Sequence, residues 1–402
     1  MNTKTPRDWL MQTKIRNIRL IDAGLFALIA LAAVWLRVAL LPAASGDITD
    51  FLTPWLERLR NAGRFARFGL AIGDYAPPYM YILSLISFFP ADWSIPLIKL
   101  VSCVFDFAAA AVALRYVYRR SGRVGYGLAA FAAVLFLPTV WLNSAYWGQC
   151  DSIFTFFCLL SVLRFAEDKP KRGALFFGLA FIFKLQAVFL APFLLYLWLH
   201  KKVKLRHGLI AAGVWVASFL PARLAGRSLG NMAAIYLNQT GLYPQLSLNA
   251  PNPWYFFGSS SPELAAAGLV LAAVAAVLGL YFLLNRDVAF TSGNFLHIGL
   301  FFAILMPFFL PHMHERYFYL ADVLSLFYAF SRAGTPGTRL ARLSRVLVPV
   351  CVGLGSMAAY MAFLFGKNYL TFSALMMTAG LGLVTYELFA PGPGRGITAD
   401  AE

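Results

Sequence analysis

Long apolar runs separated by short polar segments extend along almost the whole chain. Runs of roughly 17–22 apolar residues are long enough for a helix to cross the hydrocarbon core of a bilayer. The runs are continuous and do not alternate with a period of two, which excludes a transmembrane β-barrel. The pattern therefore predicts an all-α, polytopic membrane protein, because a helix satisfies its own backbone hydrogen bonds in lipid.

About twelve of these runs are predicted to span the membrane, with bounds good to a few residues. The run 79–90 is not counted, because it holds only about a dozen apolar residues and follows two prolines. It fits a re-entrant or interfacial helix instead. The predicted spans are about 21–42, 96–117, 124–143, 151–166, 173–185, 187–199, 207–224, 263–284, 294–310, 318–331, 346–365 and 371–389.

Basic residues decide the predicted topology, because Lys and Arg gather in cytoplasmic loops. Their clusters fall on one side of the membrane if the run 79–90 does not cross it. Both termini are then cytoplasmic. The first 20 residues are too polar for a signal peptide, so the first apolar run is expected to remain as a helix. The predicted parts are a basic segment 1–20, one membrane domain 21–390 with long outer loops at about 43–95 and 225–262, and a cytoplasmic tail 391–402.

The composition agrees with this class, since 60% of the residues are hydrophobic and 13% are charged, whereas soluble domains carry about 25% charged residues. A net charge of +16 would suggest nucleic-acid binding in a soluble protein. Here the basic residues lie in short loops, so the expected partner is membrane lipid and not nucleic acid. The four cysteines have neither disulfide nor metal spacing.

Five polar clusters stand at the ends of apolar runs, and the predicted topology brings all five to the outer face. Excess polar groups are costly at a bilayer boundary, so their convergence predicts a functional site and favours an enzyme over a scaffold. The clusters are 45–50, 73–79, 146–151, 183–186 and 312–317.

The acidic residues of the first two clusters also have structural interpretations. Asp50 suits the N-cap of a short amphipathic helix near 50–62, whereas Asp47 is less needed as a cap. Asp74 lies in a turn before two prolines, which explain the turn by themselves.

The next two clusters leave similar alternatives. Trp147 could be an interfacial anchor, and Asp151 could cap the next helix. Lys184 could reach the lipid headgroups, but its neighbour Gln186 has no such explanation.

The densest cluster, 312–317, has three interpretations. Its two histidines and Glu315 could bind a metal, although their spacing matches no standard zinc pattern. Glu315 and Arg316 could be paired elsewhere in a capped loop. Arg316 and a histidine could instead bind a phosphate group.

Two charged residues fall inside a predicted span. Lys99 and Asp106 share one helix face, and buried charges need partners. We expect a structural role for both residues, and pairing with each other through neighbours is one option.

The order of the motifs resembles one class of membrane enzymes. It is similar to that of the GT-C class of polyprenyl-phosphate-sugar-dependent glycosyltransferases, above all to bacterial relatives of the mannosyltransferase that adds the second mannose of glycosylphosphatidylinositol anchors. The similarity covers roughly residues 20–320, and Ala76 is a small departure from the Tyr-Pro-Pro usual in that family. The motifs that carry the resemblance are Gly46-Asp47, Asp74-Tyr75-Ala76-Pro77-Pro78-Tyr79, Trp147-Gly148-Gln149-Cys150-Asp151, Lys184-Leu185-Gln186-Ala187 and His314-Glu315-Arg316-Tyr317.

The resemblance implies a GT-C fold with its active site at the outer face and one catalytic acid in the first outer loop. Asp47 is the matching position, and Asp50 and Asp74 are held in reserve. The groups expected to bind the donor phosphate are Arg316, His314 and Lys184. The residues expected in the sugar and acceptor pocket are Asp74, Tyr75, Trp147, Gln149, Asp151, Gln186, Glu315, Asn252 and Trp254, with the segment 249–254 closing over a substrate.

The predicted function is that of an inverting glycosyltransferase in a bacterial inner membrane. It would move a hexose, by resemblance mannose, from a polyprenyl-phosphate carrier to a hydroxyl of a glycan or lipid-linked acceptor. This chemistry requires no cofactor, and a divalent metal is left open. The alternative is a transporter or flippase of lipid-linked glycans, which should have inverted repeats and charges deep in several spans. The sequence offers little of either.

Overall fold

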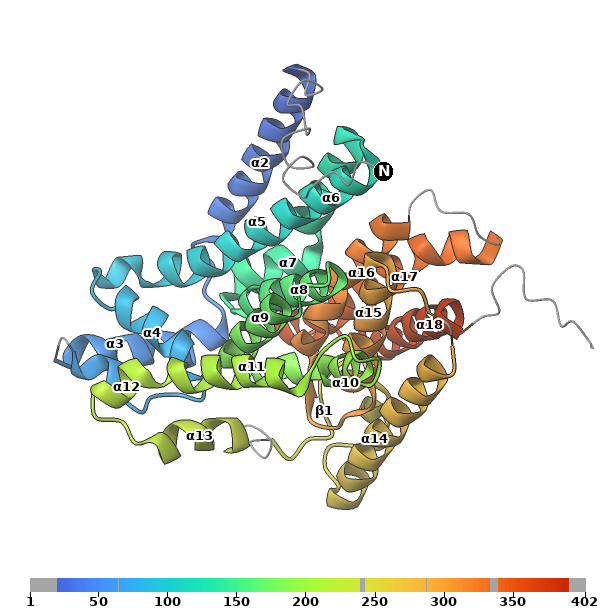
Figure 1. Ribbon diagram of the computed structural model, residues 1–402. Helices are drawn as coiled ribbons and strands as arrows, with labels where there is room; N and C mark the ends of the chain where they lie inside the picture. Colours follow the sequence, from blue (N-terminus) through green and yellow to red (C-terminus); the bar gives the residue numbers. More distant parts are fainter. Residues whose placement is uncertain (1–19, 64, 239–242, 287, 333–338, 390–402) are drawn as a thin grey trace, which may run out of the picture.

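The computed structural model describes residues 20–63, 65–238, 243–286, 288–332 and 339–389 (Figure 1). The predicted terminal segments 1–20 and 391–402 lie outside the described residues, except for Leu20. The helices and strands, in chain order, are α2 (Leu20–Leu40), η2 (Ile48–Leu52), α3 (Thr53–Asn61), η3 (Ala66–Gly69), α4 (Pro77–Ile86), η4 (Ala91–Trp93), α5 (Ser94–Ser121), α6 (Val124–Phe136), α7 (Pro138–Trp141), η5 (Leu142–Trp147), α8 (Asp151–Ala166), α9 (Pro170–Phe183), η6 (Leu185–Leu190), α10 (Ala191–Leu199), α11 (Leu205–Ser218), α12 (Leu220–Leu224), α13 (Leu229–Asn238), β1 (Ser247–Leu248), η7 (Pro253–Phe257), α14 (Pro262–Leu284), α15 (Ser292–Phe309), β2 (Met313–His314), η8 (Glu315–Phe318), α16 (Tyr319–Arg332), α17 (Arg339–Phe365) and α18 (Leu370–Phe389).

The all-α class is confirmed, because the strands among the described residues are limited to the two-residue pair β1 and β2. By length and composition, 7 helices in the described part of the chain could cross a membrane, or up to 8 if α6 and the segment Pro138–Trp147, bent by 49°, form one span. The protein is therefore a multi-pass membrane protein. The predicted total of about twelve spans is not confirmed. Four of the predicted spans are helical but too short to be counted as membrane-crossing by length, namely α8, α9, η6 with α10, and α16.

Local sequence explains where the helices break. Leu137, which precedes Pro138, has extended backbone (φ −60°, ψ 123°) and ends α6, because proline disfavours the helical conformation of the preceding residue. Lys184 is also extended (φ −147°, ψ 136°) and separates α9 from η6. This break confirms the predicted turn between two short helices, and it places Lys184 at the end of α9.

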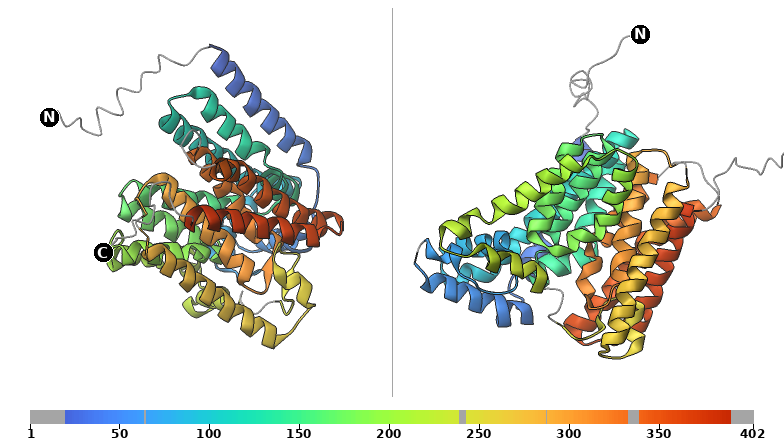
Figure 2. Two further views of the ribbon diagram at one scale, coloured as in Figure 1. Left: turned by 90° about the vertical axis from the view of Figure 1, so that its right-hand side faces the viewer. Right: turned by 60° about the horizontal axis from the view of Figure 1, so that its bottom comes forward.

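The helices differ strongly in how far they are buried. In the most apolar stretch of α15, 78% of the residues are buried inside the protein, whereas the corresponding share for α2 is 11%. Figure 2 shows α2, in dark blue, at the edge of the bundle. Exposed apolar side chains on α2, such as Trp35, are suited to contact with lipid.

Buried charges tie the edge helix to the bundle. Arg37 of α2 forms an ion pair with Asp106 of α5 (Nη2–Oδ2, 3.0 Å), and Asp106 also accepts hydrogen bonds from Ser144 and Tyr319. The Lys99 ammonium instead donates to the carbonyl groups of residues 40, 41 and 43, which end α2 (2.6–3.2 Å). Both residues thus bind within the bundle as expected, but the option that they pair with each other was wrong, because Lys99 binds backbone carbonyls and Asp106 binds Arg37.

The first predicted outer loop contains η2, α3, η3, α4 and η4, and its predicted amphipathic helix near 50–62 is confirmed as η2 with α3. Asp50 does not cap this helix as predicted. It lies inside η2, where its Oδ1 accepts a hydrogen bond from the Thr49 hydroxyl (2.9 Å). The chain already turns at Ser45, whose carbonyl accepts the backbone N–H groups of Ile48 and Thr49, so the helical turn starts earlier than the acidic pattern indicates.

The bundle has two chemically different ends. At one end the C-termini of α5 and α16 meet the N-terminus of α15, where Tyr116 hydrogen-bonds Ser292 and Arg332 donates to Asn294. The basic residues in the last turns of α5 and α16, Arg119, Arg120 and Arg332, belong to this end. The other end holds the first turns of α8 and α16 and the last turns of α9 and α15, and it carries the polar clusters.

Candidate active site

One pocket of about 340 Å³ joins residues from all five polar clusters. The cluster residues in its lining are Asp47, Asp74, Tyr75, Gln149, Lys184, Gln186, His314, Arg316 and Tyr317. These residues lie far apart in the sequence and meet because η2, the turn before α8, the break after α9 and the loop after α15 are all at the same end of the bundle.

Asp47 is held at the pocket by one of its two carboxylate oxygens. Its Oδ2 accepts hydrogen bonds from Trp147 Nε1 (3.0 Å) and from the side-chain amide of Gln149. Gln149 is itself oriented by the Tyr75 hydroxyl, which donates to its Oε1 (2.8 Å). Among the described residues no other group hydrogen-bonds the carboxylate, so Oδ1 is available to a ligand.

The turn that supplies these donors depends on a glycine. Gly148 has φ +79°, which a residue with a side chain rarely adopts. A Cβ atom at Gly148 would also lie 2.7 Å from Ile48 Cδ1, next to Asp47. The Ser45 hydroxyl completes the contact by donating to the Trp147 carbonyl (2.7 Å). The sequence at 147–149 thus lets the turn pack directly on the segment that carries Asp47.

Lys184 is fixed by a buried carboxylate behind the pocket wall. Its ammonium forms an ion pair with Asp151 Oδ1 (2.6 Å), and Asp151 Oδ2 accepts a hydrogen bond from Asn143 (2.9 Å). Asn143 also donates to the Tyr360 hydroxyl of α17 (3.0 Å). Asp151 is fully buried and is absent from the pocket lining, so it positions Lys184 instead of meeting a ligand.

Arg316 and His314 share a second buried carboxylate, that of Glu315. Arg316 Nη1 lies 3.1 Å from Glu315 Oε1, and His314 Nδ1 lies 3.8 Å from Oε2. The alternative in which Glu315 and Arg316 pair elsewhere was therefore wrong, since η8 turns the two neighbours toward each other. Burial lowers the pKa of His314, and the charge of Arg316 lowers it further, so His314 is neutral near pH 7 and can donate one ring N–H.

Aromatic rings surround the charged groups. The Arg316 guanidinium stands over the rings of Trp147 (5.4 Å) and Tyr317 (5.9 Å), and the Lys184 ammonium lies 5.7 Å from the Tyr75 ring centre. Burial raises the pKa of Tyr75 and of Tyr317, so both hydroxyls stay protonated as donors. Rings that exclude water strengthen the attraction between these cations and an anionic ligand.

The predicted residues of the second outer loop lie outside the pocket lining. Asn252 is fully buried and donates to the carbonyl of Pro307 (3.3 Å), and Trp254 Nε1 donates to that of Phe309 (2.8 Å). Both groups thus satisfy carbonyls at the end of α15. The loop reaches the pocket through β1, which pairs with β2 and brings Leu248 into the lining.

The two reserve acids occupy different places. Asp50 is exposed and is absent from the lining, whereas Asp74 lines this pocket and an adjoining hollow that also contains Arg227. Trp147 and Glu315, like Asp151, are buried behind the wall and act on the pocket through the groups that they hold.

Several lining residues were not predicted as site residues, namely Phe51, Leu52, Trp55, Phe183, Tyr243, Leu248, Tyr317 and Phe363. Tyr317 could have been found from its place beside Arg316. Trp55 gave a weaker signal as an aromatic on the short amphipathic helix. Phe363 gave none, because an aromatic residue inside an apolar run is typical of packing.

A metal site finds no support in the geometry of the described residues, among which no group of three or more His, Cys, Asp or Glu side chains could hold a metal ion. The pocket instead brings the carboxylate of Asp47 together with two cations and a neutral histidine. These are groups suited to a reaction in which an anionic leaving group departs as a proton is removed.

The fold and the pocket define a multi-pass helical membrane protein with a pocket lined by Lys184 and Arg316 at one end of its bundle. The model of glycosyltransferase family 87 matches residues 74–306, more than half of the chain, and the protein belongs to this family. It is therefore a membrane glycosyltransferase, which acts on a sugar donor and an acceptor. No curated protein matches the chain.

The matched range includes Gln149 and Lys184 but neither Asp47 nor Arg316, which join the site through the fold. The resemblance to membrane glycosyltransferases is confirmed at the level of the family. The match shows no particular mannosyltransferase relative.

Proposed function

We propose that the protein transfers a hexose from a polyprenyl-phosphate carrier to an acceptor hydroxyl, with inversion at the anomeric carbon and with Asp47 as the general base. One observation carries the proposal: Asp47 faces the pocket with Oδ1 accessible, while Oδ2 is held by Trp147 and Gln149. A carboxylate fixed in this way can accept a proton without losing its position.

The proposed step needs no general acid, because a polyprenyl phosphate is already a good leaving group. The acceptor hydroxyl gives its proton to Asp47 as its oxygen attacks the anomeric carbon from the face opposite the phosphate. The bond between that carbon and the phosphate oxygen breaks, and its electron pair leaves with the polyprenyl phosphate. A single displacement of this kind inverts the configuration, in contrast to the two-step scheme of retaining glycosidases.

Positive charge in the same pocket supports the departure of the phosphate. Lys184 and Arg316 line the pocket, and Asp151 and Glu315 hold them from behind. Together with the N–H of His314, they would stabilise the charge that develops on the leaving group. Tyr75, Asp74 and Gln186 are the lining groups proposed to contact sugar or acceptor.

The finer assignments rest on the resemblance of the motifs. Mannose is the proposed hexose, a glycan or lipid-linked glycan the proposed acceptor, and the periplasmic face of a bacterial inner membrane the proposed location of the pocket. The single membrane domain over 21–390, with cytoplasmic termini, is part of the same proposal. The position of the pocket at the end opposite the basic segments supports this orientation.

The test is transfer of labelled sugar from a panel of polyprenyl-phosphate sugars by purified, reconstituted protein. The Asp47→Asn variant should lose about 10²–10⁴-fold in transfer rate, the usual effect of removing a general base. Asp50→Asn is the matched control, because Asp50 is also an acid of η2 but lies outside the pocket lining. It should retain most of the wild-type rate, and thermal unfolding should show both variants folded.

Different outcomes identify different failures. Unchanged turnover in Asp47→Asn would reject Asp47 as the base, and a loss confined to Asp50→Asn would reassign it. If wild-type protein transfers sugar from no polyprenyl-phosphate donor but moves lipid-linked glycans across the bilayer, the enzyme proposal fails in favour of a flippase.

A further inference from the structure

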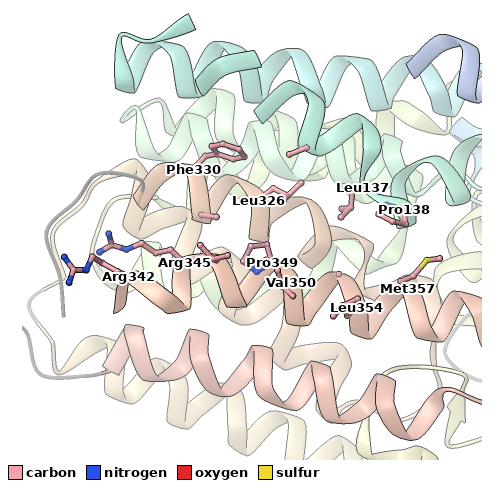
Figure 3. A pocket seen from close by; sticks show the side chains of 14 residues that line it. Leu137, Pro138, Leu326, Phe330, Arg342, Arg345, Pro349, Val350, Leu354 and Met357 are labelled. Carbon is pink, nitrogen blue, oxygen red and sulfur yellow. The ribbon is translucent and has the colours of Figure 1, made fainter. Parts of the chain in front are cut away.

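A second hollow lies along α17, between this helix, α16 and the bend that joins α6 to α7 (Figure 3). We call it the α17 groove. Its volume is about 970 Å³, against about 340 Å³ for the candidate active site. Apart from Arg342 and Arg345, the side chains that line it are apolar. None of the functions assigned to the candidate active site uses this groove.

The groove has the dimensions of a lipid tail. Arg342 and Met357, near its two ends, are about 22 Å apart along α17 at 1.5 Å per residue. This is a large part of the roughly 30 Å hydrocarbon thickness of a bilayer. Small residues at Ala133, Ala329 and Gly353 leave the space open, and exposed side chains such as Val350 face the surroundings of the bundle.

One end of the groove is cationic. Arg342 is exposed and Arg345 half-buried, and their spacing of three residues puts them on one face of α17. Figure 3 shows both guanidinium groups at the same end, with Leu354 and Met357 toward the other. The described lining includes no acidic side chain. Guanidinium groups beside an apolar channel complement a phosphate headgroup joined to an acyl chain.

The cationic end lies away from the candidate active site. Helix α17 reaches that site at its other end, where Phe363 lines the pocket and Tyr360 packs edge-on against Trp147 (5.3 Å). A donor whose phosphate lies beside Arg316 therefore cannot also place that phosphate at Arg342. The groove suits a lipid inserted from the opposite leaflet, whose headgroup lies at the basic end of the bundle.

We propose that the α17 groove binds a phospholipid of the bilayer with a net negative headgroup, such as phosphatidylglycerol. One acyl chain lies along α17, and the phosphate is bound by Arg342 and Arg345. The bound lipid fills the space between α17 and α16. This inference does not depend on the proposed glycosyl transfer.

The test compares phosphatidylglycerol with phosphatidylcholine of the same acyl chains, each titrated into purified protein in detergent while thermal unfolding is measured. Phosphatidylglycerol should raise the unfolding midpoint of the wild type at lower concentration. In the double variant Arg342→Gln, Arg345→Gln its apparent affinity should fall roughly tenfold, to that of phosphatidylcholine. The matched control is Lys202→Gln, Arg206→Gln, which removes the same charge from a basic hollow elsewhere.

A third variant tests the groove itself. A Cβ atom at Gly353 would have Leu137 as its near neighbour at 3.6 Å, so Gly353→Phe can fit while filling the channel. It should abolish the saturable effect of both lipids.

Three results would overturn the proposal. The preference for phosphatidylglycerol could survive in the double arginine variant. It could also be lost equally in the control variant, and the preference would then depend on the net charge of the protein and not on the groove. Polyprenyl phosphate could displace phosphatidylglycerol and lose its own effect in the double variant, which would make the carrier lipid the occupant.

Discussion

At the scale of single residues, the proposed base is a carboxylate that is held at one of its two oxygens. Trp147 and Gln149 both donate to Oδ2 of Asp47. Because both bind the same oxygen, they orient the carboxylate and leave Oδ1 to the proposed acceptor. Orientation of a reacting group lowers the entropic barrier to reaction.

His314 provides a prediction about pH. Burial and the charge of Arg316 lower its pKa from the ordinary 6.5, so the neutral form prevails at pH 6.5 and above. Glutamine is also a neutral donor, so His314→Gln should retain more activity than His314→Leu. The pH–rate profiles of His314→Gln and wild type should have the same shape between about pH 6.5 and 8.

Steady-state transfer rates across this range check the prediction, with saturating donor so that binding does not limit the rate. A titration near pH 7 that is present in the wild type and absent from His314→Gln would show that the histidine acts in its charged form.

Sequence identified most polar groups of the pocket but not their pairings. Lys184 and Arg316 were expected to bind phosphate, and both line the pocket. Their partners, Asp151 and Glu315, lie behind the wall, because two buried cations without carboxylates would be too costly. No sequence spacing connects Lys184 to Asp151. Their contact depends on how α8 and α9 pack, which a pattern along one chain does not specify.

At the scale of elements, the turn 147–149 connects the packing of the helices to the chemistry. Gly148→Ala would place a Cβ atom 2.7 Å from Ile48 Cδ1 and impose a φ of +79° on a residue with a side chain. We expect it to reduce the free energy of unfolding by about 1–3 kcal/mol and to reduce the transfer rate, since Trp147 and Gln149 must shift with the turn.

Gly125→Ala in α6 is the matched control, because a Cβ atom there meets nothing within 4 Å. It should leave stability unchanged or slightly improved. Thermal unfolding and transfer assays on both variants measure the effect. Equal behaviour of the two alanine variants would mean that the Gly148 turn relaxes freely and does not position Asp47.

Helix positions followed from the sequence with good accuracy, because proline, glycine and apolar periodicity act locally. The amphipathic segment that ends at Asn61 is such a local effect. The bend at Pro138 is local too, but the predicted span 124–143 did not include it. Spans were harder to predict than helices. The helices α8 and α9 are short, and whether a short helix crosses a bilayer depends on its neighbours and not on its own length.

At the scale of the whole molecule, the separation of charge defines a direction across the membrane. The pocket lies at one end of the bundle, beside the first residues of α8 and the segment that leads into α10. A basic hollow lies where α8 and α10 end, and it is lined by Lys169, Lys171, Lys202 and Arg206. The convergence of the five polar clusters could be predicted from the sequence, because the basic residues of many loops together decide on which side of the membrane each loop lies. The place of Phe363 in the pocket lining could not be predicted, because it depends only on where the end of α17 packs in the bundle.

This separation predicts which residues can be labelled from outside the cell. Trp93, exposed beside the pocket end, and Lys202, exposed at the basic end, are replaced singly by cysteine. A membrane-impermeant maleimide should label Trp93→Cys in intact spheroplasts and Lys202→Cys only after permeabilisation, since basic loops are retained in the cytoplasm. Background is low because three native cysteines are buried, and Cys351 can be replaced by serine. The opposite labelling pattern would put the candidate active site in the cytoplasm, where a donor presented on the outer leaflet could not reach Lys184 and Arg316.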